Sequence, residues 1–262
     1  MTEGDTHAST PPDPIRLVPL LGWPLIEEGQ ALVPLVIESA ERQGITLADG
    51  FVVVAQKVIS KSEGRVVALA TVEPSAEALA IAEEFAEFEK DPRQVEVVLR
   101  ESRRIVRKGH GVLICETRHG FVCANAGVDL SNAPGEDVAV LLPEDCDASA
   151  ARLHADLEAA GARNVGVVVS DTFGRPWREG LVDTALGSAG FRPIDDVRGR
   201  PDLAGRELLV TAMATADQLA AAAGLLMTKD SGVPAVWIEG IVPQGEGRLA
   251  DMLRDPSKDL FR

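Results

Sequence analysis

Two short runs of apolar, mostly β-branched residues stand out along the chain. Residues 51–55 read Phe-Val-Val-Val-Ala, and residues 165–169 read Val-Gly-Val-Val-Val. An uninterrupted apolar run of this length predicts a strand buried on both faces, whereas a half-exposed strand alternates apolar and polar positions. We therefore predict two buried strands, and each is followed at once by polar residues.

Helical spacing of apolar residues predicts helices between and after these strands. The helix from Asp91 has an N-cap residue, Pro92 at its first position and Gln94 where a capping box requires it; we expect it to end at Gly109. Gly174 and Pro176 should end the strand at 165–169, and an Ala/Leu-rich helix is expected from about Leu181. The other predicted helices span residues 32–43, 75–88 and 147–160, with an Ala-rich helix ending at 227.

The remaining segments predict short strands and loops. Residues 112–116 and 121–124 flank Thr-Arg-His-Gly and predict a hairpin. Further strands are expected at 207–211 and 235–238, a basic loop at 198–206, and a loop with a polar tail from Gln244 onward. Taken alone, this periodicity favours a three-layer α/β arrangement.

The charge balance limits the partners. The 262 residues include 26 Lys and Arg against 41 Asp and Glu, a formal charge of −15. Such a surface repels polyphosphate backbones and anionic lipids, so we expect neither nucleic acid nor a membrane as partner. A small anionic ligand stays compatible if metal ions and a few cations reverse the field in one cleft.

The sequence carries no sign of export. Its three cysteines, Cys115, Cys123 and Cys146, form no C-x-x-C pair, which fits a reducing cytoplasm. Residues 1–14 lack the features of a signal peptide and are expected to be a disordered tail. The Ala-rich run at 208–227 contains Asp217 and Gln218 and does not resemble a membrane span.

Polar side chains of the types that bind metals or anions follow several predicted strands. Asp171 and Thr172 come directly after the run at 165–169 and offer hard oxygen donors for Mg²⁺ or Mn²⁺, although a simple turn-capping role is equally compatible with this local pattern. Arg175 and Arg178 follow as cations for anionic oxygens. Gly127 permits a bend that brings Asp129, Ser131 and Asn132 together in a similar loop.

Basic residues follow the other buried strand. Lys57, Lys61 and Arg65 could receive phosphates, and the alternative is an exposed basic loop. There is no P-loop, no G-x-G-x-x-G after a strand and no G-x-S-x-G elbow, which argues against those nucleotide-binding and hydrolase classes. The pattern that remains suits metal-assisted handling of a phosphorylated substrate.

Three ordered motifs make the chain resemble a known family. They read Lys-Val-Ile-Ser-Lys-Ser-Glu-Gly-Arg at 57–65, Cys-Ala-Asn-Ala-Gly-Val-Asp-Leu-Ser-Asn at 123–132, and Ser-Asp-Thr-Phe-Gly-Arg-Pro-Trp-Arg at 170–178. Together they resemble the coenzyme F420-0:L-glutamate ligase, or F420 γ-glutamyl ligase, family, from Ile15 to about Arg248. The resemblance implies an α+β fold of two lobes in an intertwined homodimer. It also implies a stand-alone catalytic unit over residues 15–262, without the nitroreductase-like domain found in some relatives.

The resemblance implies a GTP-dependent ligase of coenzyme F420 biosynthesis. The carboxylate of F420-0 would take the γ-phosphoryl group of GTP, and L-glutamate would displace phosphate from the acyl phosphate. Further glutamates would then be added through γ-linkages. Two divalent ions, Mg²⁺ or Mn²⁺, and K⁺ as a further cation are the implied cofactors.

The resemblance also assigns roles to residues by matching position. Asp129, Asp171 and Lys61 would be catalytic. The implied metal ligands are Asp129, Asp171, Thr172 and, in a loop that is one residue shorter than in some relatives, Asp230. The implied nucleotide contacts are Trp23, Pro24, Leu25, Ile26, Gln56, Lys57, Lys61 and Asn132, with Gln56 standing where relatives commonly have Ser. For Trp23 alone, the sequence also fits an ordinary core residue.

Two alternatives come from other functional classes. A metal-dependent nucleotide phosphohydrolase could use the same carboxylates and would release phosphate without glutamate. A non-catalytic nucleotide-binding protein would be stabilised by nucleotide without turnover.

Overall fold

A five-stranded mixed sheet forms the centre of the protein in a computed structural model that describes residues 14–135 and 137–260. The expected disordered tail at 1–14 lies, apart from Pro14, outside the described residues. In spatial order the strands are β1 (Arg16–Leu20), β12 (Ala235–Glu239), β2 (Ala48–Ala55), β8 (Arg163–Arg175) and β9 (Arg178–Ala189). Only β2 and β8 run parallel, with Val52 opposite Val167.

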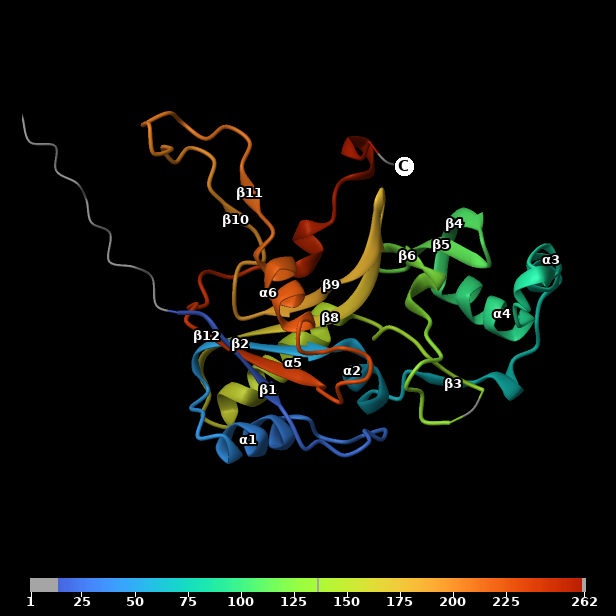
Figure 1. The fold of residues 1–262 in the computed structure, drawn as a ribbon, viewed down its shortest axis with the longest axis horizontal. Coiled ribbons are helices and arrows are strands. Elements are labelled where there is room, and N and C mark those ends of the chain that lie inside the picture. Colours follow the sequence, from blue (N-terminus) through green and yellow to red (C-terminus); the bar gives the residue numbers. More distant parts are fainter. Residues whose placement is uncertain (1–13, 136, 261–262) are drawn as a thin grey trace, which may run out of the picture.

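Helices cover both faces of this sheet, as Figure 1 shows. Val52 and Val54 of β2 pack on the face covered by α1 (Val33–Arg42) and α5 (Cys146–Ala159). Phe51 and Val53 point to the opposite face, which α6 (Thr215–Gly224) covers. Since successive side chains of a strand alternate between faces, the apolar runs at 51–55 and 165–169 are buried on both sides, as predicted.

A second region with its own hydrophobic cluster lies beside the sheet (Figure 1). It is built from a three-stranded sheet and two helices, α3 (Ala76–Glu84) and α4 (Pro92–Glu101). The strands are β4 (Ser102–Gly109), β5 (Val112–Thr117) and β6 (Val122–Ala124), and the short 3₁₀ helices are η1 (Leu69–Thr71), η2 (Ala86–Phe88) and η3 (Asn125–Gly127).

Shorter elements connect and extend these regions. A paired β3 (Val66–Ala68) and β7 (Val138–Val140) lie between them, and α2 (Gln56–Ser62) follows β2 directly. The chain between β10 (Asp195–Asp196) and β11 (Ala212–Met213) forms an arm that projects from the sheet in Figure 1. Two 3₁₀ helices, η4 (Leu249–Met252) and η5 (Pro256–Lys258), close the described chain.

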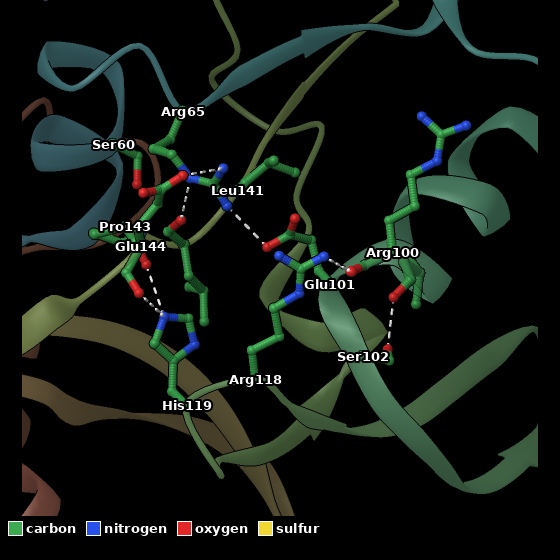
Figure 2. Close-up of polar contacts among 12 residues, drawn as sticks. Ser60, Arg65, Arg100, Glu101, Ser102, Arg118, His119, Leu141, Pro143 and Glu144 are labelled. Atoms are coloured by element: carbon green, nitrogen blue, oxygen red, sulfur yellow. Dashed lines mark hydrogen bonds and ion pairs between the residues drawn. The ribbon is translucent and has the colours of Figure 1, made fainter.

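Arg65 fastens the second region to the sheet. Its Nη2 donates to Glu101 Oε2 at 2.8 Å, at the end of α4, and its Nε donates to the carbonyl oxygen of Leu142 at 2.9 Å. Figure 2 shows this contact next to His119, whose Nε2 lies 2.8 Å from the carbonyl oxygen of Pro143. Both ion-paired side chains are largely buried, so this junction links the end of α4 in the second region to the segment that follows α2.

Several predicted elements are confirmed within a few residues. They are the helices at 32–43 and 147–160, the hairpin of β5 and β6, and the strand at 235–238. The helix predicted at 75–88 is divided into α3 and η2, and the Ala-rich helix ends at Gly224 rather than at 227. Among its described residues, the polar tail contains η4 and η5 and no helix or strand longer than these.

Four expectations were wrong. Residues 102–108 form strand β4 instead of continuing the helix from Asp91, because Ile105 and its neighbours pair with β5. The helix expected near Leu181 is strand β9, paired with β8 along its length. Strand β8 continues through the polar residues at 170–172 to Arg175 instead of ending at them, because it pairs with β9 there, and the strand predicted at 207–211 is absent, since β11 begins at Ala212.

The architecture mixes helices with separate sheets, which is consistent with the α+β class. The central sheet between its helices accounts for the three-layer impression given by the periodicity. Among the described helices, none combines the length and the apolar character that a membrane crossing requires.

Candidate active site

A cavity of about 530 Å³ opens where β2 ends beside Ser170 of β8. Because these neighbouring strands are parallel, with Ala55 opposite Ser170, the residues that follow the two apolar runs lie at one edge of the sheet, although β8 itself continues to Arg175. Two loops complete the walls: residues 23–26 after β1 and residues 227–234 before β12. The polar residues that follow the two buried strands are therefore brought to the same place.

All eight residues expected to contact nucleotide line this cavity. They are Trp23, Pro24, Leu25, Ile26, Gln56, Lys57, Lys61 and Asn132. Asp171 and Thr172 line it as well. Residues separated by more than 100 positions in the sequence thus form one concave surface, which is the usual form of a small-molecule site.

The internal contacts of these residues show which groups stay available to a ligand. Trp23 packs against the core and its Nε1 donates to Ser39 Oγ at 3.0 Å, so its ring is both a core residue and a cavity wall. The side chain of Gln56 is buried and donates to Ser60 Oγ and to the carbonyl oxygen of Leu141. The amide group of Gln56 is therefore engaged inside the protein, and Gln56 mainly supports the cavity wall.

Lys61 joins two of the motifs. Its Nζ donates to the carbonyl oxygen of Asn132 at 2.5 Å. Burial and the nearby charge of Lys57 lower the pKa of Lys61. Two lysines that repel each other at the mouth of a cavity are a favourable arrangement for binding phosphate oxygens, because an anion relieves their repulsion.

Asp129 is held by cations and hydrogen bonds. Its Oδ2 lies 2.8 Å from Lys57 Nζ and 3.6 Å from Lys229 Nζ, and its Oδ1 accepts a bond from the backbone N–H of Ser131 at 2.7 Å. Burial opposes ionisation, but these bonds outweigh it and hold the pKa of Asp129 at about 2. Asp129 is thus fully ionised at neutral pH.

Asp171 lies in the opposite kind of environment. Burial raises the pKa of Asp171 to about 6; the charge of Lys57 opposes this rise, while Asp129 and Asp183 add to it. A β-bulge between Val169 and Ser170 redirects the chain just before this residue. A carboxylate that is desolvated and only partly compensated favours the arrival of a further cation.

Thr172 is oriented by a residue that the sequence did not single out. Its Oγ1 donates to Asp183 Oδ1 at 2.8 Å, and the two residues are opposite each other in the pairing of β8 with β9. Burial raises the pKa of Asp183, which also lines the cavity. Because the Thr172 hydroxyl donates its hydrogen bond to Asp183, the lone pairs of Oγ1 are available to accept a hydrogen bond or to coordinate a cation.

A smaller cavity of about 250 Å³ adjoins the first. Asp171, Thr172 and Lys229 line both cavities, whereas Asp129 lines only the smaller one. The rest of its wall comes from the segment 124–128, from Phe173 and Gly174 of β8, and from Leu181 of β9.

The donor set suits a divalent cation that a nucleotide brings with it. Asp129, Asp171, Asp183 and Thr172 offer oxygen ligands of the type that Mg²⁺ and Mn²⁺ prefer. Among the described residues, no three His, Cys, Asp or Glu side chains converge tightly enough to hold a metal on their own. Mg²⁺ in proteins commonly binds through one or two carboxylates together with substrate phosphates and water.

Asp230 lies in the loop at 227–234, but its side chain is exposed and its Oδ1 accepts from Thr228 Oγ1 at 2.8 Å. It is not part of either cavity wall, and its role as a metal ligand stays a prediction. The neighbouring Lys229 lines both cavities, and its carbonyl oxygen accepts from Asn132 Nδ2 at 3.2 Å.

Sequence reasoning missed Asp183 and Lys229. Asp183 was overlooked because the segment after Pro176 was expected to be helical. The sequence signal for the turn was Pro176, since proline favours the second position of a β-turn. In the structure Arg175 and Arg178 enclose this two-residue turn, and Trp177 has a positive φ of 57°. No sequence signal marked Lys229, which reaches the site only through the folding of its loop.

Comparison with known proteins agrees with this geometry. Residues 21–240 match the F420-0:gamma-glutamyl ligase family, which covers both the cavity and the strands that form it. The chain belongs to this family of ligases. It is 45% identical over 254 residues to "Coenzyme F420:L-glutamate ligase" of Methanothermobacter thermautotrophicus, covering 95% of this chain and 99% of the relative.

Two further relatives carry the same name. The protein of Methanopyrus kandleri is 44% identical over 255 residues, covering 95% of this chain and 98% of the relative. That of Methanocaldococcus jannaschii is 42% identical over 219 residues, covering 82% and 86%. The F420 γ-glutamyl ligase resemblance that the three motifs indicated is therefore confirmed.

Proposed function

We propose that the protein is a GTP-dependent ligase that joins L-glutamate to coenzyme F420-0 and then adds further γ-linked glutamates. One observation supports this above the others: the eight expected nucleotide contacts line a single cavity together with Asp171 and Thr172. The family membership supplies the two substrates, F420-0 and glutamate, by analogy with the named relatives.

The proposed reaction has two steps. A carboxylate oxygen of F420-0 attacks the γ-phosphorus of GTP, the bond to the bridging oxygen breaks, and GDP leaves with the bonding electron pair. The amine nitrogen of glutamate then attacks the acyl carbon; the phosphate leaves with its C–O bonding pair and the nitrogen loses a proton. Both steps bring anions together, so neutralising charge is the main task of the site.

Lys57 and Lys61 would bind the nucleotide phosphates, and Trp23 with Leu25 would flank its base or ribose. Asp129, Asp171 and Thr172 would hold Mg²⁺ or Mn²⁺, with Asp230 as a further ligand and K⁺ as an additional cation. When bound, the divalent ions would neutralise the charge that develops on the transferred phosphoryl group. In the free protein Lys57 neutralises Asp129 in their place.

A homodimer is part of the proposal. The arm between β10 and β11 projects from the sheet and exposes Leu203, Leu209 and Val210, which a second copy of the chain would cover. Light scattering of the purified protein tests this: we expect twice the mass of one chain.

The decisive assay measures GDP and product mass together. We expect GDP only when F420-0, L-glutamate and Mg²⁺ or Mn²⁺ are all present, with a mass increase of one or more glutamyl residues. Phosphate release without glutamate would instead identify a phosphohydrolase. Thermal stabilisation by GTP without any turnover would identify a non-catalytic nucleotide-binding protein.

A further inference from the structure

A buried backbone segment, residues 140–142, fixes the main chain of Asp129. The backbone N–H of Asp129 donates to the carbonyl oxygen of Val140 at 3.1 Å, and the N–H of Val140 donates to the carbonyl oxygen of Asp129 at 2.8 Å. This isolated antiparallel bridge joins Asp129 to residues 140–142, whose side chains are all buried. The position of Asp129 therefore follows the position of this segment.

Gln56 and Arg65, on either side of α2, bind both polar groups of the Leu141 backbone. Gln56 Nε2 donates to the carbonyl oxygen of Leu141 at 2.7 Å, and the N–H of Leu141 donates to the carbonyl oxygen of Arg65 at 3.0 Å. The side chain of Arg65 adds a third bond, from its Nε to the carbonyl oxygen of Leu142 at 2.9 Å. Because buried backbone groups need partners, these three bonds hold the segment in this one arrangement.

We propose that Gln56 and Arg65 are positioning residues that set where the Asp129 carboxylate meets its cation, and that the amide of Gln56 does this instead of contacting the nucleotide. The inference rests on the proposed function, in which Asp129 helps to bind Mg²⁺ or Mn²⁺. Mg²⁺ requires nearly octahedral geometry with ligands at about 2.0–2.1 Å, so a carboxylate ligand must be placed by rigid surroundings.

Helix α2 is a suitable reference for Asp129 because it is continuous with the central sheet. It follows β2 directly, and β2 pairs in parallel with β8, which carries Asp171. Lys57, in the first turn of α2, also contacts the Asp129 side chain, with its Nζ 2.8 Å from Oδ2. The start of α2 thus holds the side chain of Asp129 through Lys57 and its main chain through Gln56. One helix therefore sets the position of Asp129 relative to Asp171.

Arg65 connects the same segment to the second region, from which Asp129 comes. Its Nη2 donates to Glu101 Oε2 at 2.8 Å, and the two side chains are only 19% and 11% exposed. Figure 2 shows the Arg65 side chain beside Leu141 and directed toward Glu101. Because removing one partner would leave the other charge buried and unpaired, this ion pair resists a displacement of the second region on the sheet.

Gln56→Met tests the assignment, because methionine has a similar length but no hydrogen-bond donor. With GDP bound, we expect the Kd for Mn²⁺, measured from the EPR signal of free Mn²⁺, to rise about tenfold. At saturating Mn²⁺ the KM for GTP should stay within about twofold of the wild-type value. In the metal-free protein the amide hydrogens of Asp129 and Val140 should exchange faster with solvent.

The matched control is Ser60→Ala. It removes the other acceptor of Gln56 Nε2, at 2.5 Å, and leaves the bond to Leu141 in place, so the Kd for Mn²⁺ should not change. In Gln56→Met, a raised KM for GTP with an unchanged Kd for Mn²⁺ would identify a nucleotide contact. A lowered melting temperature with neither constant changed would identify a merely structural residue. Either result overturns the inference.

Two further variants keep the test decisive if Gln56→Met does not fold. Gln56→Ser is too short to reach Leu141 and should weaken Mn²⁺ binding equally. Arg65→Lys keeps the charge but loses the forked contacts to Glu101 and Leu142, and we expect the Kd for Mn²⁺ to rise about threefold. An unchanged Kd in both would refute the inference. If the wild type binds Mn²⁺ with GDP but forms no glutamylated product, the ligase proposal fails and the positioning of Asp129 stands.

Discussion

Asp129 and Asp171 come from two regions of the molecule and have opposite environments. Asp129 follows η3 in the second region, where Lys57 and Ser131 hold its pKa at about 2. Asp171 follows the buried part of β8, where burial raises its pKa to about 6. The first carboxylate is stable as an anion in the free protein, and the second is costly as an anion until a cation arrives. The comparison indicates that bound cations are needed to balance the charge of the site.

The largest expected effect follows from removing the uncompensated charge. Asp171→Asn keeps the size of the side chain but loses the negative charge, and we expect product formation to fall by at least about 10³-fold because the transferred phosphoryl group loses its metal support. Product mass and GDP are measured side by side, with circular dichroism as the check of folding. Unchanged product formation would remove Asp171 from the metal site.

A stability measurement sharpens the comparison. In metal-free protein at about pH 8, Asp171→Asn should raise the melting temperature, whereas Asp129→Asn should lower it, each by the equivalent of about 1 to 3 kcal/mol. The raised pKa of Asp171 means that its contribution to stability is full at low pH and is lost as pH rises through about 6. The lowered pKa of Asp129 means that its contribution is present above about pH 4 and is lost toward pH 2.

The two variants should therefore diverge with pH. At about pH 4.5 wild-type Asp171 is largely protonated, so Asp171→Asn should melt close to the wild type, while Asp129→Asn should still melt lower. Thermal unfolding at both pH values, with a chelator present, makes this measurement. Melting temperatures that shift in the same direction at about pH 8 would show that the two environments are not opposite.

A carboxylate far from the cavity gives the smallest expected effect. The side chain of Ser75, its backbone N–H at 2.9 Å and Arg100 Nε at 2.8 Å interact with the Glu96 carboxylate and lower the pKa of Glu96 to about 2. Glu96→Gln should cost about 1 kcal/mol of unfolding free energy at neutral pH.

This cost should diminish as pH falls from about 4.5 toward 2, where the wild-type carboxylate takes up a proton. Ligase activity at neutral pH should be unchanged, since Glu96 supports only α3 and α4. A loss of activity without a loss of stability would contradict this structural role. It would also show that the low pKa of Glu96, like that of Asp129, belongs to a functional residue.

The sequence predicted the two central strands well because burial on both faces leaves a clear pattern. The runs at 51–55 and 165–169 could hardly be anything but central strands, and the polar residues after them had to meet once the strands lay parallel. This explains why the expected nucleotide contacts share one cavity. The roles of the individual residues came from the family resemblance.

The sequence was less informative where tertiary pairing overrides local preference. Residues 102–108 carry cations that suit the end of a helix, yet pairing with β5 makes them a strand. Residues 181–189 are rich in Ala and Leu, yet pairing with β8 gives them the extended conformation of a strand. The sequence pattern therefore did not indicate that Asp183 lies in the site. Lys229 depends on a loop whose course no periodicity describes.

The partition shared by the two cavities has a practical consequence. Because Asp171, Thr172 and Lys229 contribute to both cavities, a single compound that joins a nucleotide-like head to a second group of the size of the smaller cavity could occupy both. Tethering the two halves makes the second binding event intramolecular, so such a bisubstrate compound should bind far more tightly than either fragment.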